Sequence, residues 1–187
     1  SDISGTAQIV QDPGGIETYA NNEIDLIAGS PGLPGFPPFI PPTPGEVTAD
    51  MNINIVGINQ PTITSGLITT VCIENFTITP LSGTIGLDDV EIILTCPSGT
   101  SINLVNVGDL SGNTISNMCF EIGGAAIGSG SAPYSGTFAP QQSFDLLNGC
   151  SSEGVWNLTI TGENYDFDIP FGSVTGWDIT FDDPPIY

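Results

Sequence analysis

The chain has 187 residues with 21 Asp and Glu side chains but no Lys, Arg or His, which gives a formal net charge of −21 at pH 7. A chain of this length usually holds roughly 20 basic residues, and their absence leaves nothing to neutralise phosphate or anionic lipid, which excludes nucleic-acid binding and electrostatic attachment to membranes. Proteases specific for Lys or Arg also find no cleavage site in this chain. We take an extracellular setting rich in proteases as the favoured explanation; the alternatives are that the chain avoids non-specific binding to polyanions, or that it saves nitrogen.

The chain begins with an expected N-terminal arm, residues 1–28, that contains two short strand candidates, Thr6–Gln11 and Glu23–Ala28. A turn signal at Asp12–Gly15 separates them. We expect this extended arm to pack against another copy of the module, with folding back onto its own domain as the alternative. Residues 29–46 follow with seven prolines among 18 residues, which predicts a stiff, polyproline-like linker or, alternatively, a ligand for an aromatic groove.

From residue 47 to residue 187, short alternating apolar runs separated by Gly, Pro, Asn and Asp predict many strands and no helix of useful length. The fold class is therefore all-β, a jelly-roll-like β-sandwich. The two tryptophans fall on alternating positions and are expected in its core. The clearest runs contain Met51, Ile53 and Ile55; Val71–Ile78; Val90, Ile92 and Leu94; Ile102 and Leu104; Met118–Phe120; Trp156, Leu158 and Ile160; and Val174, Trp177, Ile179 and Phe181.

Four dispersed cysteines, Cys72, Cys96, Cys119 and Cys150, predict two disulfides and an oxidising compartment, because no C-x-x-C pair or histidine is present to complete a zinc site. If the strands holding Cys72 and Cys96 form a hairpin centred near Thr84, these two residues face each other. The expected pairs are then Cys72–Cys96 and Cys119–Cys150. No stretch approaches the about 18 apolar residues of a membrane span, so membrane insertion is not expected.

Catalysis is not expected either, because the familiar Ser, Cys and Lys nucleophile arrangements need a His or a Lys. Carboxylate pairs remain chemically possible. The segment Asn22–Ile27 resembles the nucleophile strand of jelly-roll β-glucanases, but Ala28 stands where a third acid would be required. We therefore interpret the chain as a non-enzyme.

Four segments in register resemble one known family. Asp89–Thr100 reads DVEIILTCPSGT, and Tyr134–Pro140, Gly154–Leu158 and Gly172–Ile179 follow in the expected order. Across about residues 50–182 the chain resembles the P domain that accompanies subtilisin-like proprotein convertases and many secreted bacterial proteases. It departs from the common bacterial pattern in having four cysteines and a short insertion before residue 88.

The resemblance implies a secreted jelly-roll module without catalytic residues, and it implies Ca²⁺ as a possible cofactor. The matched candidate ligands are Asp89, Asp109, Asn113 and Glu121, with Asp166 and Asp168 as a second candidate group. Oxygen ligands in turns suit Ca²⁺. The alternative interpretation is that these acids are solvated turn residues.

Three functions remain open at this point. The first is a structural or adhesive extracellular module, a possible surface-filament subunit, that self-associates through residues 1–28 or docks on neighbouring domains of a larger surface protein. The second is an accessory P domain that stabilises a larger secreted protease. The third is a carbohydrate-binding jelly-roll module.

Overall fold

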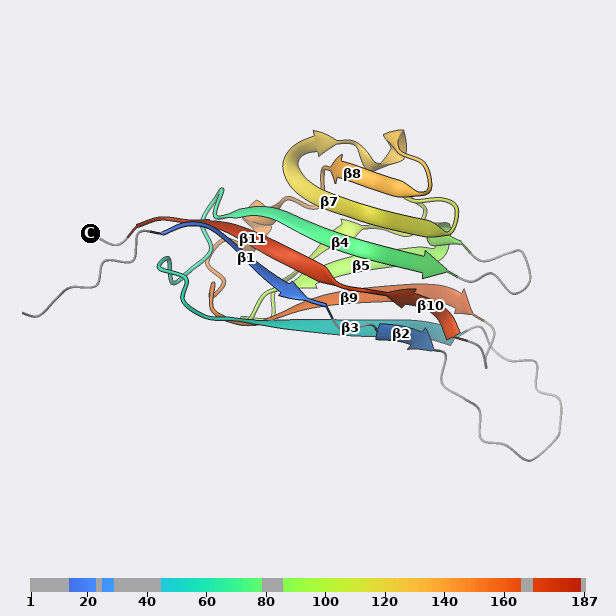
Figure 1. Cartoon of the computed structure of the whole chain (residues 1–187), viewed down its shortest axis with the longest axis horizontal. Helices are drawn as coiled ribbons and strands as arrows, with labels where there is room; N and C mark the ends of the chain where they lie inside the picture. Colours follow the sequence, from blue (N-terminus) through green and yellow to red (C-terminus); the bar gives the residue numbers. More distant parts are fainter. Residues whose placement is uncertain (1–13, 23–24, 29–44, 79–85, 166–169, 186–187) are drawn as a thin grey trace, which may run out of the picture.

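The computed structural model describes residues 14–22, 25–28, 45–78, 86–165 and 170–185, and these form two β-sheets packed face to face (Figure 1). The predicted all-β sandwich is therefore confirmed. In chain order the described elements are β1 (Gly15–Asn21), β2 (Asp25–Ala28), β3 (Gly45–Ile55), β4 (Ile68–Ile78), η1 (Leu87–Asp89), β5 (Val90–Thr95), β6 (Ser101–Val105), β7 (Thr114–Ala125), η2 (Ile127–Ser129), β8 (Tyr134–Phe138), η3 (Phe144–Leu147), β9 (Gly154–Tyr165), β10 (Pro170–Val174) and β11 (Trp177–Asp183).

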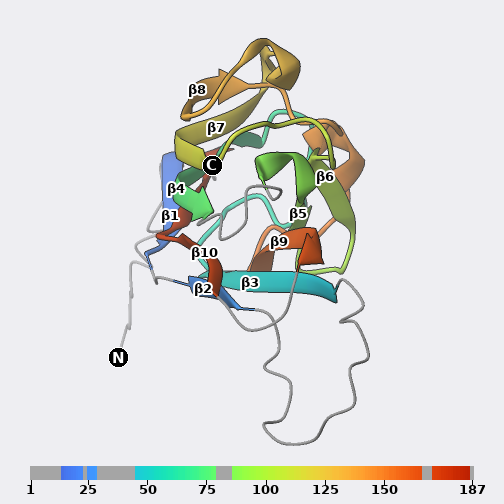
Figure 2. The same ribbon diagram turned by 90° about the vertical axis from the view of Figure 1, so that its right-hand side faces the viewer.

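The larger sheet is built around β4, which pairs with β7 on one side and with both β10 and β11 on the other. Strand β1 pairs with β11, strand β2 pairs with β10, and β8 extends the opposite side by pairing in parallel with β7. The smaller sheet has the order β3-β9-β5-β6. Figure 2 shows the two layers nearly end-on, with β3 and β2 side by side at one margin.

Period-two alternation explains how the strands form one core. Strand β3 buries Met51, Ile53 and Ile55 and exposes Asn52 and Asn54, since successive strand side chains point to opposite faces. The prediction that both tryptophans lie in the core is confirmed, because Trp156 and Trp177 are fully buried. The Trp156 ring meets Phe181 of the other sheet edge-on, with ring centroids 5.9 Å apart.

The N-terminal arm supplies two strands to the larger sheet of its own chain. The candidate Glu23–Ala28 corresponds to β2, Asp25–Ala28, whereas the candidate Thr6–Gln11 lies outside the described residues. Strand β1 was not predicted, because GIETYAN has no apolar face of its own. It forms along the edge of β11, with Gly15 opposite Asp183 and Asn21 opposite Trp177.

The two disulfides form, but the predicted pairing was wrong. Cys72 bonds to Cys119, directly opposite it on β4 and β7, and Cys96 bonds to Cys150. The hairpin assumption failed because the chain crosses from one sheet to the other between β4 and β5. Cys72 and Cys96 therefore lie in different layers of the sandwich.

Candidate functional site

Three of the four described metal-ligand candidates lie on segments that neighbour each other in the fold. Asp89 ends η1, while Asp109 and Asn113 lie in the loop between β6 and β7. Two backbone hydrogen bonds hold this loop against η1: Gly108 N–H donates to the Asp88 carbonyl at 2.8 Å, and Leu87 N–H donates to the Gly112 carbonyl at 2.7 Å. The backbone therefore brings the segments that carry Asp89, Asp109 and Asn113 next to each other.

The side chains of the candidate ligands have other positions and partners. The Asp109 carboxylate accepts the Asn106 N–H at 2.7 Å, which closes its own turn. Glu121 lies well along β7, one residue beyond Phe120, which pairs with Val71. Among the described residues, no group of three or more His, Cys, Asp or Glu side chains is placed to hold a metal ion. Asp166 and Asp168 lie outside the described residues.

A different set of oxygen atoms converges beside Gly86, just before η1. A Cβ atom at this glycine would lie 2.5 Å from Asp88 Oδ1, 3.1 Å from the Gly112 carbonyl oxygen and 3.7 Å from Asn113 Oδ1. The absence of a side chain therefore lets three oxygen atoms approach one point. The sequence did not single out Asp88 as a candidate, because the oxygen atoms beside it come from a loop that follows it by more than twenty residues.

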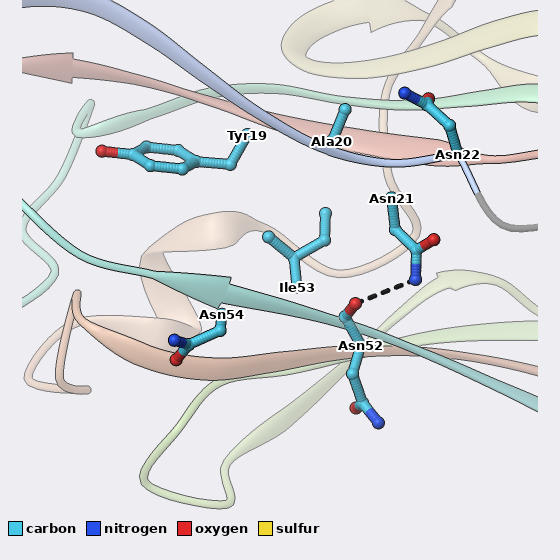
Figure 3. Close-up of a pocket in the computed structure, with 7 residues that line it drawn as sticks. All are labelled: Tyr19, Ala20, Asn21, Asn22, Asn52, Ile53 and Asn54. Carbon is cyan, nitrogen blue, oxygen red and sulfur yellow. Dashed lines mark hydrogen bonds between the residues drawn. The ribbon is translucent and has the colours of Figure 1, made fainter.

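An open groove of about 370 Å³ separates β1 from β3 at the margin of the sandwich (Figure 3). Its lining residues are Tyr19, Ala20, Asn21, Asn22, Asn52, Ile53 and Asn54. Figure 3 shows Asn52 and Asn54 directed away from β1, so that β3 presents mainly its backbone edge and Ile53 to the groove. Of the described strands, β9 alone forms a ladder with β3.

Side chains of β1 form hydrogen bonds across this groove. The Tyr19 hydroxyl donates to the Val56 carbonyl at 3.0 Å, and the Asn21 amide donates to the Asn52 carbonyl at 2.9 Å. The Tyr19 hydroxyl is also 2.7 Å from Glu17 Oε2. Burial is the main cause that raises the pKa of Tyr19 far above its ordinary value of 10.0, and the hydrogen bond to Glu17 and nearby carboxylates add to the effect.

Near one end of this groove, two carboxylates hold the loop that follows β3. Glu153 Oε1 accepts the N–H groups of Gly57 and Ile58, and the Asp183 carboxylate accepts those of Asn59 at 2.8 Å and of Gln60 at 3.1 Å. Four consecutive backbone donors are thus satisfied by two acids, one just before β9 of the smaller sheet and one at the end of β11 of the larger sheet. Asp183 is only 2% exposed, and backbone amides supply the stabilisation that a cation would otherwise provide.

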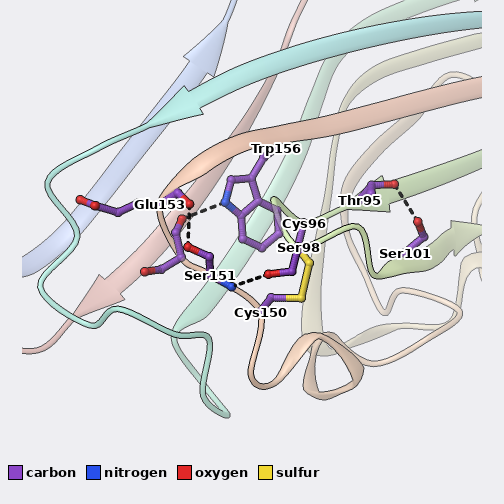
Figure 4. The surroundings of a disulfide bond; sticks show 9 residues. Thr95, Cys96, Ser98, Ser101, Cys150, Ser151, Glu153 and Trp156 are labelled. Atoms are coloured by element: carbon purple, nitrogen blue, oxygen red, sulfur yellow. Dashed lines mark hydrogen bonds between the residues drawn. A yellow bond between two sulfur atoms is a disulfide. The ribbon is translucent and has the colours of Figure 1, made fainter.

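The start of β9 reinforces the same region. Next to the Cys96–Cys150 disulfide, the Ser151 N–H donates to the Ser98 hydroxyl at 3.0 Å (Figure 4). The Trp156 indole N–H donates to the Ser152 carbonyl at 2.9 Å. The buried Ser152 hydroxyl donates to the Gln60 carbonyl. These contacts fix loops and give no nucleophile a general base.

A second acidic pair lies on the outer face of the larger sheet. Asp178 is opposite Cys72 in the β11–β4 ladder, and Glu74 is two residues further along β4. Burial raises the pKa of Asp178 above its ordinary value of 3.8, and the negative charge of Glu74 raises it further. No basic side chain can neutralise this pair, because the sequence contains no Lys, Arg or His.

No known protein family, curated protein or solved structure matches the chain. The two disulfides indicate an oxidising, extracellular-like environment. Within the described ranges, no helix has the length and hydropathy needed to cross a membrane.

We predict that Asp178→Asn raises the melting temperature at pH 7. Folding raises the pKa of Asp178, so the folded state is favoured when this carboxyl is protonated. That contribution to stability is fully present below pH 3.8 and is lost as the pH rises through the folded pKa. The advantage of the variant should therefore shrink as the pH is lowered towards 3.8. Melting curves measured between acidic and neutral pH check this.

Asp182→Asn is the matched control, since Asp182 lies on the same strand and is exposed. It removes the same formal charge, so it separates general charge repulsion from the local effect at Asp178. An equal gain for both variants would contradict a specific penalty at Asp178.

Proposed function

We propose that this chain is a non-catalytic structural or adhesive module of an extracellular assembly and that copies of it self-associate. The observation that carries the proposal is the way the N-terminal arm joins the sandwich. Strands β1 and β2 extend the edge of the larger sheet by backbone pairing with β11 and β10. Backbone pairing at a sheet edge is also how separate chains join through strands.

The engagement of the carboxylates supports a structural role over a catalytic one. Asp50 accepts the Thr159 hydroxyl at 2.8 Å, linking β3 to β9, and Glu91 accepts the Asn103 amide at 2.6 Å, linking β5 to β6. Acids used in this way stabilise strand pairs. The absence of His, Lys and Arg from the sequence also removes the usual partners of a nucleophile.

The alternatives keep their own support. The resemblance across residues 50–182 favours an accessory P domain that stabilises a neighbouring domain of a larger secreted protease. The groove between β1 and β3, with its amide and tyrosine lining, favours a carbohydrate-binding module, and binding to a glycan array would distinguish that function from the first two.

The proposal predicts oligomers whose population grows with protein concentration and with salt. Copies that each carry a net charge of −21 repel one another, and salt at ~0.15 M shortens the Debye length to about 8 Å. Light scattering over a concentration series at low and raised NaCl measures the mass, and electron microscopy of the material shows its form. A monomer throughout the series would contradict self-association.

Ca²⁺ binding is a second candidate function, favoured by the oxygen atoms of Asp88, Gly112 and Asn113 that converge beside Gly86. Carboxylate, amide and backbone carbonyl oxygens are the ligand types that Ca²⁺ takes in loops. The site would link η1 to the loop between β6 and β7, which are already hydrogen-bonded to each other.

Millimolar CaCl₂ is expected to raise the melting temperature more than NaCl of matched ionic strength, because a bound ion adds RT ln(1 + [L]/Kd) to stability. Asp88→Asn should reduce this difference. Asp145→Asn, an exposed acid on η3, is the control and should leave it unchanged. Equal shifts in the two salts would show that these acids are simply solvated.

A further inference from the structure

Strand β1 of the N-terminal arm adds backbone pairing to the sandwich but little buried side-chain surface. Strand β1 pairs with β11 at every position from Gly15 to Asn21. Its side chains alternate between half-buried and exposed, and Ile16 is 69% exposed. No residue of β1 belongs to the fully buried core of the described chain, although Tyr19 packs partly against it.

The opposite edge of β1 is weakly joined to the rest of the molecule. The open groove of about 370 Å³ lies between β1 and β3. The hydrogen bond from Tyr19 to the Val56 carbonyl, just after β3, and the one from Asn21 to the Asn52 carbonyl of β3 are both at exposed positions. Hydrogen bonds at exposed positions compete with water and contribute only modestly to stability. Most of the attachment of β1 is therefore the ladder with β11.

The connection from β2 to β3 is long enough to let the arm leave its own domain. Sixteen residues, 29–44, separate Ala28 from Gly45. At about 3.1 Å per residue for a proline-rich chain, such a connection can extend to roughly 50 Å. A connection of this length allows the arm to pair with a copy that lies beside its own domain.

We propose that the arm exchanges between copies, so that β1 and β2 of one chain occupy the β11 and β10 edge of another in the same register. This inference rests on the proposed self-association and names its surface. Exchange replaces each ladder with an identical one between two chains, so the strand contacts are conserved. The free-energy cost of exchange is then the loss of freedom on association and the repulsion between two negatively charged chains. A chain that receives an arm from one neighbour and gives its own to another forms an open series rather than a closed pair.

The Thr18–Thr180 pair gives a direct test, because their hydroxyl oxygens are 2.9 Å apart across the β1–β11 ladder. A preparation of Thr18→Cys is mixed with one of Thr180→Cys at high concentration and raised NaCl, then oxidised. Exchange predicts a disulfide between residues 18 and 180 of different chains, identified by peptide mass analysis with a non-tryptic protease. The double variant Thr18→Cys/Thr180→Cys, oxidised when dilute, should give a monomer closed on itself.

The register control pairs Thr18→Cys with Asp182→Cys. Asp182 lies on the same strand and pairs with Ile16, so it is out of register with residue 18. It should give much less of the mixed disulfide than Thr180→Cys. If light scattering shows oligomers while both mixtures give equal cross-linking, exchange is overturned and self-association stands. If the chain stays monomeric and no 18–180 cross-link forms, both are overturned.

Discussion

The structure depends on how its carboxylates are stabilised in a chain that has no cationic side chain. Ordinary proteins pair buried acids with Lys, Arg or His, and here backbone N–H groups, amides and hydroxyls take that role. The most developed case is the loop after β3, where Glu153 and Asp183 together accept four consecutive backbone donors, from Gly57 to Gln60. Hydrogen bonds to a charged acceptor are stronger than neutral ones, so both the acid and the loop gain from the contact.

This arrangement connects the two layers. Glu153 immediately precedes β9 in the smaller sheet and Asp183 ends β11 in the larger one, so the loop is fastened to both. The Cys96–Cys150 bond lies close by, next to Trp156 (Figure 4). Described acids such as Asp50, Asp145 and Asp182 are exposed, and their charge opposes the approach of another copy unless salt screens it. The same composition that removes cleavage sites for Lys- and Arg-specific proteases thus makes the proposed self-association dependent on ionic strength.

The sequence predicted the strands whose alternation is strong, such as Met51, Ile53 and Ile55 on β3, because burial of one face determines them. It did not predict β1, since that strand depends on the edge of β11 rather than on its own side chains. The disulfide pairing could not be derived from spacing alone, because the crossing between β4 and β5 places Cys72 and Cys96 in different sheets. The oxygen atoms beside Gly86 likewise depend on a loop that meets η1 only in the folded chain.

The free energy of unfolding of Asp183→Ala, compared with that of Asp182→Ala, tests the central claim most directly. Both changes remove one carboxylate from the end of β11, but only Asp183 accepts the N–H groups of Asn59 and Gln60. Leaving two such donors without their acceptor should cost roughly 2–6 kcal/mol, whereas the exposed Asp182 change should stay within about 0.5 kcal/mol. Equal effects of the two substitutions, or a gain in stability for Asp183→Ala, would contradict the account.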